Sequence, residues 1–365
     1  MRTIISIGLM VFLLPVFTAS ALLATTIVVD HAGSGDYTTI GEAVTAAPSG
    51  AEIVIMPGTY PEFVIVAKSL TFTANGLPGS VIWDGENSHR ILKVRTPIAV
   101  SFTGIEFRDG FDPIEDGCGV AIHIDTGAVV TIDQCRFINN HASWDGAVFA
   151  GLSGTSVTIT NSHFEDNYAY HNCPAAGVLL DAEMVIDNCT FIDNICSNIS
   201  GAVASWQADL SVQHCLFAGN TGGTAGAILV SGGGGDIYNN TFHDNHGGNV
   251  VLISTSSPYS YHHNIMTINT SGGGLYMSSG ITHGCNLFYE IAGDEVSGGL
   301  APDEIVADPL YCDYTVGDFN LCYMSPALPE NNGCGMMGAF SMGCTTCGPI
   351  ANEDRAWGDV KKMYD

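Results

Sequence analysis

A phenylalanine recurs through the middle of the chain inside a short unit that starts with a small residue and ends with Asn. The clearest copies are Cys135-Arg136-Phe137-Ile138-Asn139-Asn140, Ser162-His163-Phe164-Glu165-Asp166-Asn167, Cys189-Thr190-Phe191-Ile192-Asp193-Asn194, Cys215-Leu216-Phe217-Ala218-Gly219-Asn220 and Asn240-Thr241-Phe242-His243-Asp244-Asn245. Together with fainter copies at Phe107 and Met266, these anchor positions are 24 to 30 residues apart. A β-rich unit of that length, punctuated by Gly and Asn and lacking a helical period, predicts one coil of a parallel β-helix.

The residues around each anchor form columns that would stack from coil to coil. Five positions before the anchors, every residue is apolar: Ile132, Ile159, Ile186, Val212, Ile237 and Tyr261. Three positions after them, every residue is asparagine: Asn140, Asn167, Asn194, Asn220, Asn245 and Asn269. Stacked coils lie about 4.7–4.9 Å apart, so we expect the apolar column to be buried. We expect the asparagines to adopt the left-handed bend that ends a strand and to bond to one another as a ladder.

These Phe-x-x-Asn units, followed by Gly-Ala-Val or Gly-Ala-Ile elements such as Gly146-Ala147-Val148 and Gly226-Ala227-Ile228, resemble the repeats of chlamydial polymorphic outer-membrane proteins. More broadly they resemble secreted proteins with the pectin-lyase-like fold. The resemblance covers about residues 98–290 and implies a surface-exposed or secreted solenoid, often adhesive. The predicted fold is therefore all-β, a right-handed parallel β-helix with a short N-terminal capping helix and a disulfide-stapled C-terminal cap.

The predicted organisation has five parts: a signal peptide at residues 1–21, an N-terminal cap and first coils at 22–97, the repeats at 98–290, C-terminal coils and cap at 291–347, and a tail at 348–365. The signal peptide is read from Arg2, an apolar stretch from Ile4 to Phe17, and the small-x-small site Ala19-Ser20-Ala21. It predicts a secreted or cell-surface protein. No later segment approaches the 20 apolar residues of a membrane helix.

The N-terminal cap is predicted from Thr39-Ile40-Gly41-Glu42, which has the form of a helix capping box and is followed by an apolar stripe that Pro48 ends. The surrounding segments Gly33-Ser34-Gly35-Asp36-Tyr37-Thr38-Thr39-Ile40 and Gly58-Thr59-Tyr60-Pro61-Glu62 resemble the start of pectin methylesterases. That resemblance implies a first coil of the same fold. The later segments that do the catalytic work in that family have no counterpart in this sequence.

The twelve cysteines divide into six before residue 216 and six after residue 284. We expect Cys135, Cys189 and Cys215 to be buried free thiols, since they share an inward column two positions before the anchors. We expect Cys173 to pair with Cys196. In the cap we expect Cys312 to pair with Cys322, and Cys334 with Cys344 or Cys347. Zinc at Cys344-Thr345-Thr346-Cys347 is not expected, because a second such pair is missing.

Charge narrows the classes of partner. Asp and Glu total 37 against 10 Lys and Arg, a formal net charge of −27, which argues against a nucleic-acid binder. Two positions after the anchors, Asp166 and Asp193 would lie on adjacent coils with carboxylates about 5 Å apart, which makes them a candidate calcium site. The alternative is a solvated turn column in which Asp replaces Asn, and we weigh it more heavily. The sequence indicates no cofactor other than Ca²⁺ at this candidate site.

Histidines do not suggest a transition-metal site. His243 lies one position after its anchor and His262 and His263 lie before theirs, so strand alternation sends these side chains to different faces. We therefore expect scattered surface histidines.

Two functions follow from these patterns. The first is a non-catalytic β-helix that binds a glycan, the cell envelope or a protein. The second is a carbohydrate-active enzyme of the pectin-lyase-like type: a polysaccharide lyase, hydrolase or esterase. The motifs of pectate lyases and polygalacturonases are absent from the sequence, which favours the first function and leaves no catalytic residue assigned. The expected partner is a polysaccharide or another cell-surface ligand.

Overall fold

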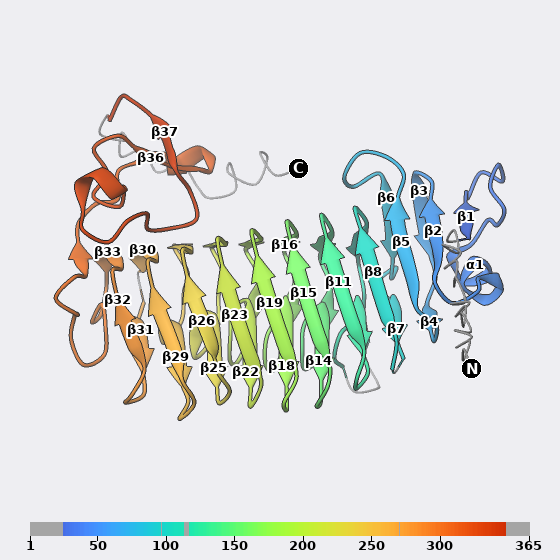
Figure 1. Cartoon of the computed structure of the whole chain (residues 1–365), viewed down its shortest axis with the longest axis horizontal. Coiled ribbons are helices and arrows are strands. Elements are labelled where there is room, and N and C mark those ends of the chain that lie inside the picture. Colours follow the sequence, from blue (N-terminus) through green and yellow to red (C-terminus); the bar gives the residue numbers. More distant parts are fainter. Residues whose placement is uncertain (1–24, 96, 113–116, 270, 348–365) are drawn as a thin grey trace, which may run out of the picture.

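The computed structural model describes residues 25–95, 97–112, 117–269 and 271–347 of the chain. The predicted signal peptide and tail lie outside the described residues. Three long parallel sheets, two of 11 strands and one of 9, run the length of the molecule, and most coils of the chain add one strand to each sheet (Figure 1). This confirms the predicted all-β, right-handed parallel β-helix. The strands that one coil contributes are called a rung.

Sheet A faces the viewer in Figure 1. Its strands are β1 (Thr26–Val29), β2 (Ala51–Ile55), β5 (Leu70–Ala74), β8 (Ala99–Thr103), β11 (Val129–Asp133), β15 (Ser156–Thr160), β19 (Glu183–Asp187), β23 (Asp209–Gln213), β26 (Gly235–Tyr238), β29 (Tyr259–His262) and β32 (Thr282–Gly284). Sheet B, which carries the anchors, lies along the upper edge of that view. Its strands are β3 (Gly58–Pro61), β6 (Val81–Asp84), β9 (Glu106–Arg108), β12 (Arg136–Ile138), β16 (His163–Glu165), β20 (Thr190–Ile192), β24 (Leu216–Ala218), β27 (Thr241–His243), β30 (Ile265–Asn269), β33 (Leu287–Ile291) and β34 (Ile305–Val306).

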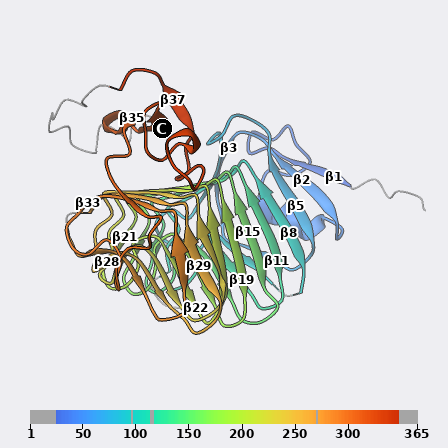
Figure 2. The ribbon, with the colours of Figure 1, turned by 60° about the vertical axis from the view of Figure 1, so that its left-hand side comes forward.

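Sheet C completes the coil. Its strands are β4 (Val64–Val66), β7 (Leu92–Val94), β10 (Ile122–Ile124), β14 (Val148–Gly151), β18 (Ala176–Leu179), β22 (Val203–Trp206), β25 (Ala225–Ser231), β28 (Asn249–Ser254) and β31 (Gly273–Met277). A short sheet D lies between sheets B and C and contains β13 (His141–Ala142), β17 (Tyr168–Ala169) and β21 (Ile195–Cys196). Figure 2 shows the same stack turned by 60°, with the coils in sequence order.

Aromatic rings and branched aliphatic side chains fill the inside of the coils. The anchor phenylalanines from Phe107 to Phe242 stack ring on ring, with centroids 4.6 to 5.2 Å apart. The apolar column predicted five positions before the anchors is buried throughout. Each buried rung therefore covers the apolar face of the next, as the repeat predicted.

The asparagine ladder is present, but the bend that we assigned to it is made by another residue. Asn140, Asn167, Asn194 and Asn220 each donate from the side-chain amide to the amide oxygen of the next rung, at 2.9 to 3.0 Å. The last residue of the predicted column, Asn269, donates to the carbonyl of Gly273 instead. The left-handed residues are those one position earlier in each unit: Asp109, Asn139, Asp166, Asp193, Gly219 and Asp244. Local side-chain bonding lets Asp and Asn tolerate that conformation at low cost.

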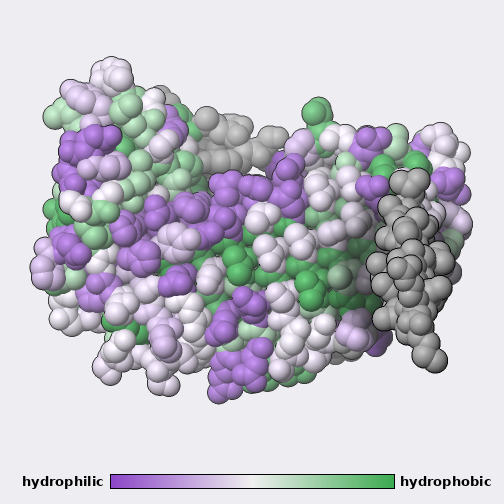
Figure 3. All heavy atoms as spheres, viewed as in Figure 1, coloured by the Kyte–Doolittle hydropathy of each residue, from purple (hydrophilic) through white to green (hydrophobic). Residues whose placement is uncertain are grey.

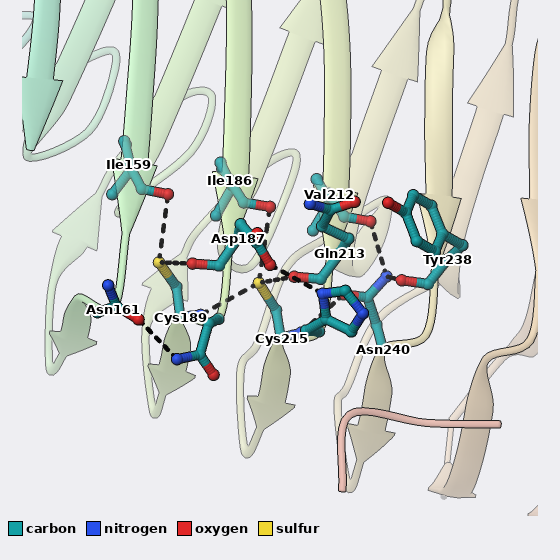
Figure 4. Close-up of polar contacts among 12 residues, drawn as sticks. Ile159, Asn161, Ile186, Asp187, Cys189, Val212, Gln213, Cys215, Tyr238 and Asn240 are labelled. Carbon is teal, nitrogen blue, oxygen red and sulfur yellow. Dashed lines mark hydrogen bonds and ion pairs between the residues drawn. The ribbon is translucent and has the colours of Figure 1, made fainter. Parts of the chain in front are cut away.

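A second buried ladder connects sheets A and B, and Figure 4 shows its central part. The backbone N–H of each rung donates to a small polar side chain of the next rung: Cys189 N–H to Cys215 Sγ at 3.4 Å, and Cys215 N–H to Asn240 Oδ1 at 2.9 Å. Cys135, Cys189 and Cys215 are free and buried, as predicted. The thiols of Cys189 and Cys215 thus act as hydrogen-bond acceptors in the place that Asn240 takes on a later rung.

Helix α1 (Ile40–Ala46) covers the N-terminal end of the coils. The predicted N-cap is correct, since Thr39 Oγ1 accepts from the N–H of Glu42 at 3.3 Å. The carboxylate of Glu62 accepts from the first two helical N–H groups, those of Ile40 and Gly41, at 2.6 and 2.8 Å. A carboxylate at this end of a helix also interacts favourably with the helix dipole.

The C-terminal cap lies on the side of the solenoid, against sheet B. It contains β35 (Tyr311–Asp313), β36 (Asp318–Cys322), β37 (Met342–Cys344) and the short 3-10 helices η1 (Tyr314–Val316) and η2 (Pro329–Asn331). Its apolar side chains, including Phe319 and Leu321, pack against Leu216, Ile265 and Leu287 on the outer face of sheet B. The apolar outer residues of β24, β30 and β33 are the reason for this position, because they would otherwise be exposed.

Disulfides staple the cap, but the predicted pairs are wrong. The bonds are Cys285–Cys334, Cys312–Cys344 and Cys322–Cys347, and the first ties the cap to the sheet A–sheet B corner of the last coils. The pairing depends on β37 returning to lie beside β36, which spacing alone does not encode. Cys173 and Cys196 are free, because their sulfurs lie against the carbonyls of Ala176 and Asn172 instead of each other.

Candidate functional site

Basic side chains are concentrated in a few adjacent rungs. Five of the ten Lys and Arg residues fall between positions 90 and 136: Arg90, Lys93, Arg95, Arg108 and Arg136. Arg90, Lys93 and Arg95 lie on the sheet C side of the coil and Arg108 and Arg136 on sheet B. In so acidic a chain, such a concentration marks these rungs as candidates for a binding site.

Four ionisable side chains form a compact block on the outer face of sheet C. Lys93 and Arg95 belong to one rung, and His123 and Asp125 occupy the equivalent positions on the next, since Lys93 pairs with His123 in the β7–β10 register. We call these four residues the sheet C block. Asp125 contacts the other three: its Oδ1 lies 3.4 Å from Lys93 Nζ and 3.4 Å from His123 Nε2, and its Oδ2 lies 3.8 Å from Arg95 Nε.

The rest of this face is uncharged. The positions equivalent to Lys93 and His123 on the other rungs are Ile65, Phe149, Gly177, Ala204, Leu229, Leu252 and Tyr276. A Lys side chain that is 19% exposed and a His side chain that is 9% exposed lose much of their hydration there. Burying such groups on an otherwise apolar sheet costs stability unless they are paired, as both are here with Asp125, and polar groups of this kind cluster at functional sites.

A buried ion pair beneath the block fixes the histidine ring. Arg90 Nη2 lies 2.7 Å from Asp112 Oδ2 and also donates to the backbone carbonyl of Cys118 at 3.0 Å. The same carbonyl accepts from Nδ1 of His123 at 3.1 Å. A carbonyl can only accept, so Nδ1 carries a proton. Nε2 faces the carboxylate of Asp125, which also accepts, so a proton taken up by Nε2 would be donated to Asp125.

Asp145 lies behind Cys118 and is almost fully buried, at 3% exposure. Its two carboxylate oxygens lie 3.5 Å from the sulfur of Cys118 and 3.9 Å from that of Cys173. Burial raises the pKa of Asp145 to about 6, although hydrogen bonds from Asn172 and the two thiols oppose the shift. The carboxyl group is therefore partly protonated in mildly acidic solution.

This raised pKa predicts a pH-dependent effect of Asp145→Asn. The folded state disfavours the charged form, so the stability present at pH 4 is lost as pH rises through 6. A shift of about two units corresponds to about 3 kcal/mol. We expect Asp145→Asn to become more stable relative to the wild type by about that amount between pH 4 and pH 7.5, measured by urea unfolding. Asp181→Asn at an exposed turn is the matched control, and a difference that does not change with pH would contradict the assignment.

The predicted calcium residues lie where the repeat placed them. Asp166 and Asp193 are on adjacent rungs, since Asp166 N–H donates to the carbonyl of Ile192 at 3.2 Å. Both adopt the left-handed conformation, with φ of 53° and 51°. Their backbone role is therefore that of turn residues. The calcium site itself stays a prediction, and Ca²⁺ normally takes six to eight oxygen ligands.

In the part of the chain that the structure describes, one group of three His, Cys, Asp or Glu side chains is close enough to share an ion: Cys285, Asp303 and Cys334. Its two cysteines form a disulfide, which removes their thiolates as ligands. Cys344 and Cys347 likewise belong to two different disulfides.

The expectation of scattered surface histidines is wrong for His243, which is 3% exposed beneath the cap. The apolar residues of the cap cover the face on which strand alternation placed it. His262 and His263 are partly buried, and their Nδ1 atoms are 2.7 Å apart.

No residue of the sheet C block was predicted from the sequence as a site residue. The pattern that would have found it is Lys-x-Arg in one strand and His-x-Asp in a later one, 30 residues on. Alternation sends each pair to one face, and one coil of separation places the pairs side by side.

The repeats match one family model. Residues 99–265 match the family model described as a right-handed beta helix region. A metabotropic glutamate receptor-like protein R from Dictyostelium discoideum is 32% identical over 152 residues, and a probable pectinesterase/pectinesterase inhibitor 13 from Arabidopsis thaliana is 28% identical over 170 residues. These alignments cover 40% and 43% of this chain but only 8% and 25% of the two relatives.

Similar solved structures include the pectin methylesterase from carrot, at 16% identity and a TM-score of 0.32, covering 82% of this chain and 94% of that one. A mannuronic acid specific polysaccharide family 6 lyase from human gut microbiota is 12% identical with a TM-score of 0.41, covering 75% of each chain. At these identities the likeness concerns the fold alone. Among the described residues, no helix is long and apolar enough to cross a membrane.

Proposed function

We propose that the protein is a secreted or cell-surface β-helix protein that binds an extended polysaccharide along the outer face of sheet C. The observation that carries the proposal is the sheet C block, the charged part of a face that is otherwise apolar and runs along the stack. An apolar face with a few convergent polar groups is the usual form of a ligand site. Lys93 and Arg95 would bind carboxylate or hydroxyl groups, and Asp125 would bind hydroxyl groups.

The local charge favours an acidic polysaccharide. Arg90, Lys93 and Arg95 are opposed by Asp112, Asp125 and the buried Asp145, so the region is balanced near pH 7 within a chain of net charge −27. Because burial raises the pKa of Asp145 to about 6, protonation of this carboxyl group in mildly acidic solution leaves one positive charge in excess. Because the rest of this acidic protein repels anions, the patch favours ligands whose negative charges lie opposite its cationic groups.

Enzymatic cleavage of the bound chain is the second candidate function, favoured by one observation. His123 is held as the Nδ1–H tautomer, and its Nε2 lies beside Asp125 and near a lysine that shares that carboxylate. A positioned imidazole next to a cation is the arrangement that proton abstraction beside a carboxylate requires. The sheet C block would then supply both the base and the charge that neutralises the substrate.

A binding and turnover panel tests both candidates. Pectin, polygalacturonate, alginate and neutral glycans would be titrated with the full protein, with Ca²⁺ or chelator, while reducing ends, unsaturated uronate absorbance and released methanol are followed. We expect binding of an acidic polysaccharide that Lys93→Gln weakens at least tenfold. The matched control is Arg108→Gln, which removes the same charge from sheet B and should leave binding within about twofold.

Binding without product would support the non-catalytic function, and product formation lost in His123→Gln would establish the enzyme. Binding that Lys93→Gln and Arg108→Gln weaken equally would refute the site, and the absence of binding to every polysaccharide would refute the proposed function.

A further inference from the structure

A pocket on the outer face of sheet B has no part in the proposed function. It lies away from the sheet C block, on the stretch of sheet B between the cap and the β5–β6 loop. Figure 3 shows the surface lowered between the cap at the upper left and the raised N-terminal loops at the upper right, with hydrophilic side chains along that edge. The pocket has a volume of about 310 Å³ and is lined by Pro78, Arg136, Asn161, Ser162, His163, Asn188 and Thr190. We call it the Arg136 pocket.

The charged part of sheet B ends where the cap begins. Glu106, Arg136, His163 and Thr190 occupy equivalent positions on four consecutive rungs. The following positions in this column, Leu216, Thr241, Ile265 and Leu287, include the apolar residues on which the cap packs. The structure thus covers the apolar half of this face with its own chain and leaves the polar half as a pocket of ligand size.

The walls of the pocket are held in place by bonds among themselves. Asn188 donates its side-chain amide to Asn161 Oδ1 at 2.7 Å, and Asn161 donates to Asp133 Oδ1 at 2.6 Å. His163 contacts Thr190 Oγ1 through Nδ1 and Glu165 through Nε2, the latter at 3.1 Å. A ligand would meet preorganised amide and hydroxyl groups, which lowers the entropy cost of binding.

Unlike the other polar side chains of the pocket, Arg136 has a charge that its neighbours compensate incompletely. Its Nε is buried and makes no hydrogen bond among the described residues. The nearest carboxylate is that of Glu106, 3.6 Å from that atom. Glu106 also pairs with Arg108, whose Nη1 lies 3.8 Å from Glu106 Oε1. One carboxylate is thus shared between two guanidinium groups, and burial raises its pKa in spite of both. A buried donor without an acceptor destabilises the protein, and an incoming acceptor would remove that cost.

We propose that the Arg136 pocket binds a small hydroxylated carboxylate, the chemical class that includes sugar acids and hydroxy acids. The carboxylate of the ligand accepts from the Arg136 guanidinium, whose planar fork matches it. The hydroxyl groups bond to the amides of Asn161 and Asn188 and to the hydroxyl of Thr190. Gly79 in the β5–β6 loop lies over this edge, since a Cβ there would sit 3.3 Å from Glu106 Oε2 and 3.7 Å from Arg136 Nη1.

Isothermal titration with glucuronate, glycerate and glucose tests the proposal on the full protein. We expect saturable binding of glucuronate, at least tenfold weaker binding of glucose, and at least tenfold weaker binding of glucuronate by Arg136→Gln. Arg136→Lys keeps the charge but loses the fork, so it should also weaken binding while preserving the fold. Glycerate shows whether the sugar ring is needed: binding equal to glucuronate assigns the site to hydroxy acids in general, and weaker binding assigns it to sugar acids.

Arg108→Gln is the matched control, because Arg108 contacts the same Glu106 but does not line the pocket. Binding in this variant should stay within about twofold of the wild type. The proposal is overturned if glucuronate does not bind, if glucose binds equally well, or if both Arg136 variants bind glucuronate as the wild type does. The sheet C block is unchanged in all these variants, so the result is independent of the proposed function.

Discussion

Replacing Asn194 by Ala is expected to lower the free energy of unfolding by about 4 kcal/mol, because this side chain completes four hydrogen bonds inside the coil. Its amide donates to the carbonyl of Phe164 at 3.0 Å and to Asn220 Oδ1 at 2.9 Å. Its oxygen accepts from the backbone and side-chain N–H groups of Asn167 at 3.1 and 2.9 Å. All of these groups are buried, so water cannot replace the missing partner.

The position of Asn194 in the stack raises the cost further. A buried donor left without an acceptor costs about 1–3 kcal/mol, and Ala would leave both N–H groups of Asn167 in that state. Each rung contacts only its neighbours, so the damage should be concentrated in the rungs of Asn167, Asn194 and Asn220. Hydrogen exchange of those rungs should accelerate more than exchange near helix α1.

The matched control for this variant is Asn198→Ala, which removes an exposed amide four residues along the same coil. It should change the free energy of unfolding by less than about 0.5 kcal/mol, measured by urea unfolding. A loss in Asn194→Ala no larger than in the control would show that the ladder does not hold the rungs together.

The columns were predictable because a fixed repeat converts sequence spacing into spatial contact. Residues one repeat apart lie at equivalent positions of adjacent rungs. Alignment of the anchors therefore predicts both the burial of Ile159 and Ile186 and the bonding of Asn167 to Asn194. The left-handed bend was misplaced by one residue, at Asn167 instead of Asp166, because both Asn and Asp tolerate that conformation. Composition cannot decide which of two adjacent tolerant residues bends the chain.

The sheet C block was not predictable in the same way, because it lies where the repeat is least regular. His123 follows a connection from β9 to β10 that is longer than in later coils, so its rung partner could not be read from the anchors. Ion pairs between rungs, such as Lys93 with Asp125, depend on that register. The cap shows the same limit, since the partner of Cys312 was set by strands that no periodic pattern describes.

His243 is expected to make the protein less stable in acid. It lies under the cap, with Nδ1 2.8 Å from Thr267 Oγ1 and its ring against those of Tyr311, Tyr314 and Phe319. Burial lowers the pKa of His243 to about 3. The unfolded chain takes up a proton near pH 6.5 and the folded protein does not, so stability is complete above 6.5 and falls as pH decreases toward 3.

Between pH 7.5 and pH 4.5 this difference corresponds to a loss of about 3 kcal/mol. We expect His243→Gln, which stays neutral and can still bond to Thr267, to lose less stability than the wild type over that interval by about this amount. His214→Gln is the control, because that ring is 45% exposed and pairs with Asp187 on the surface. It should follow the wild-type pH profile.

Protonation of His243 acts first on the contact between the cap and sheet B, so the cap should loosen before the coils unfold. As the pH is lowered, amide exchange of Phe319 and Leu321 should therefore accelerate at a higher pH than exchange at the anchor phenylalanines. His243→Gln should remove this difference. The Cys285–Cys334 bond keeps the loosened cap attached to the last coils, which makes the change reversible when the pH is restored. Two results would show that this histidine does not control the cap: amide exchange that accelerates in the cap and in the coils at the same pH, or a pH dependence of stability in His243→Gln identical to that of the wild type.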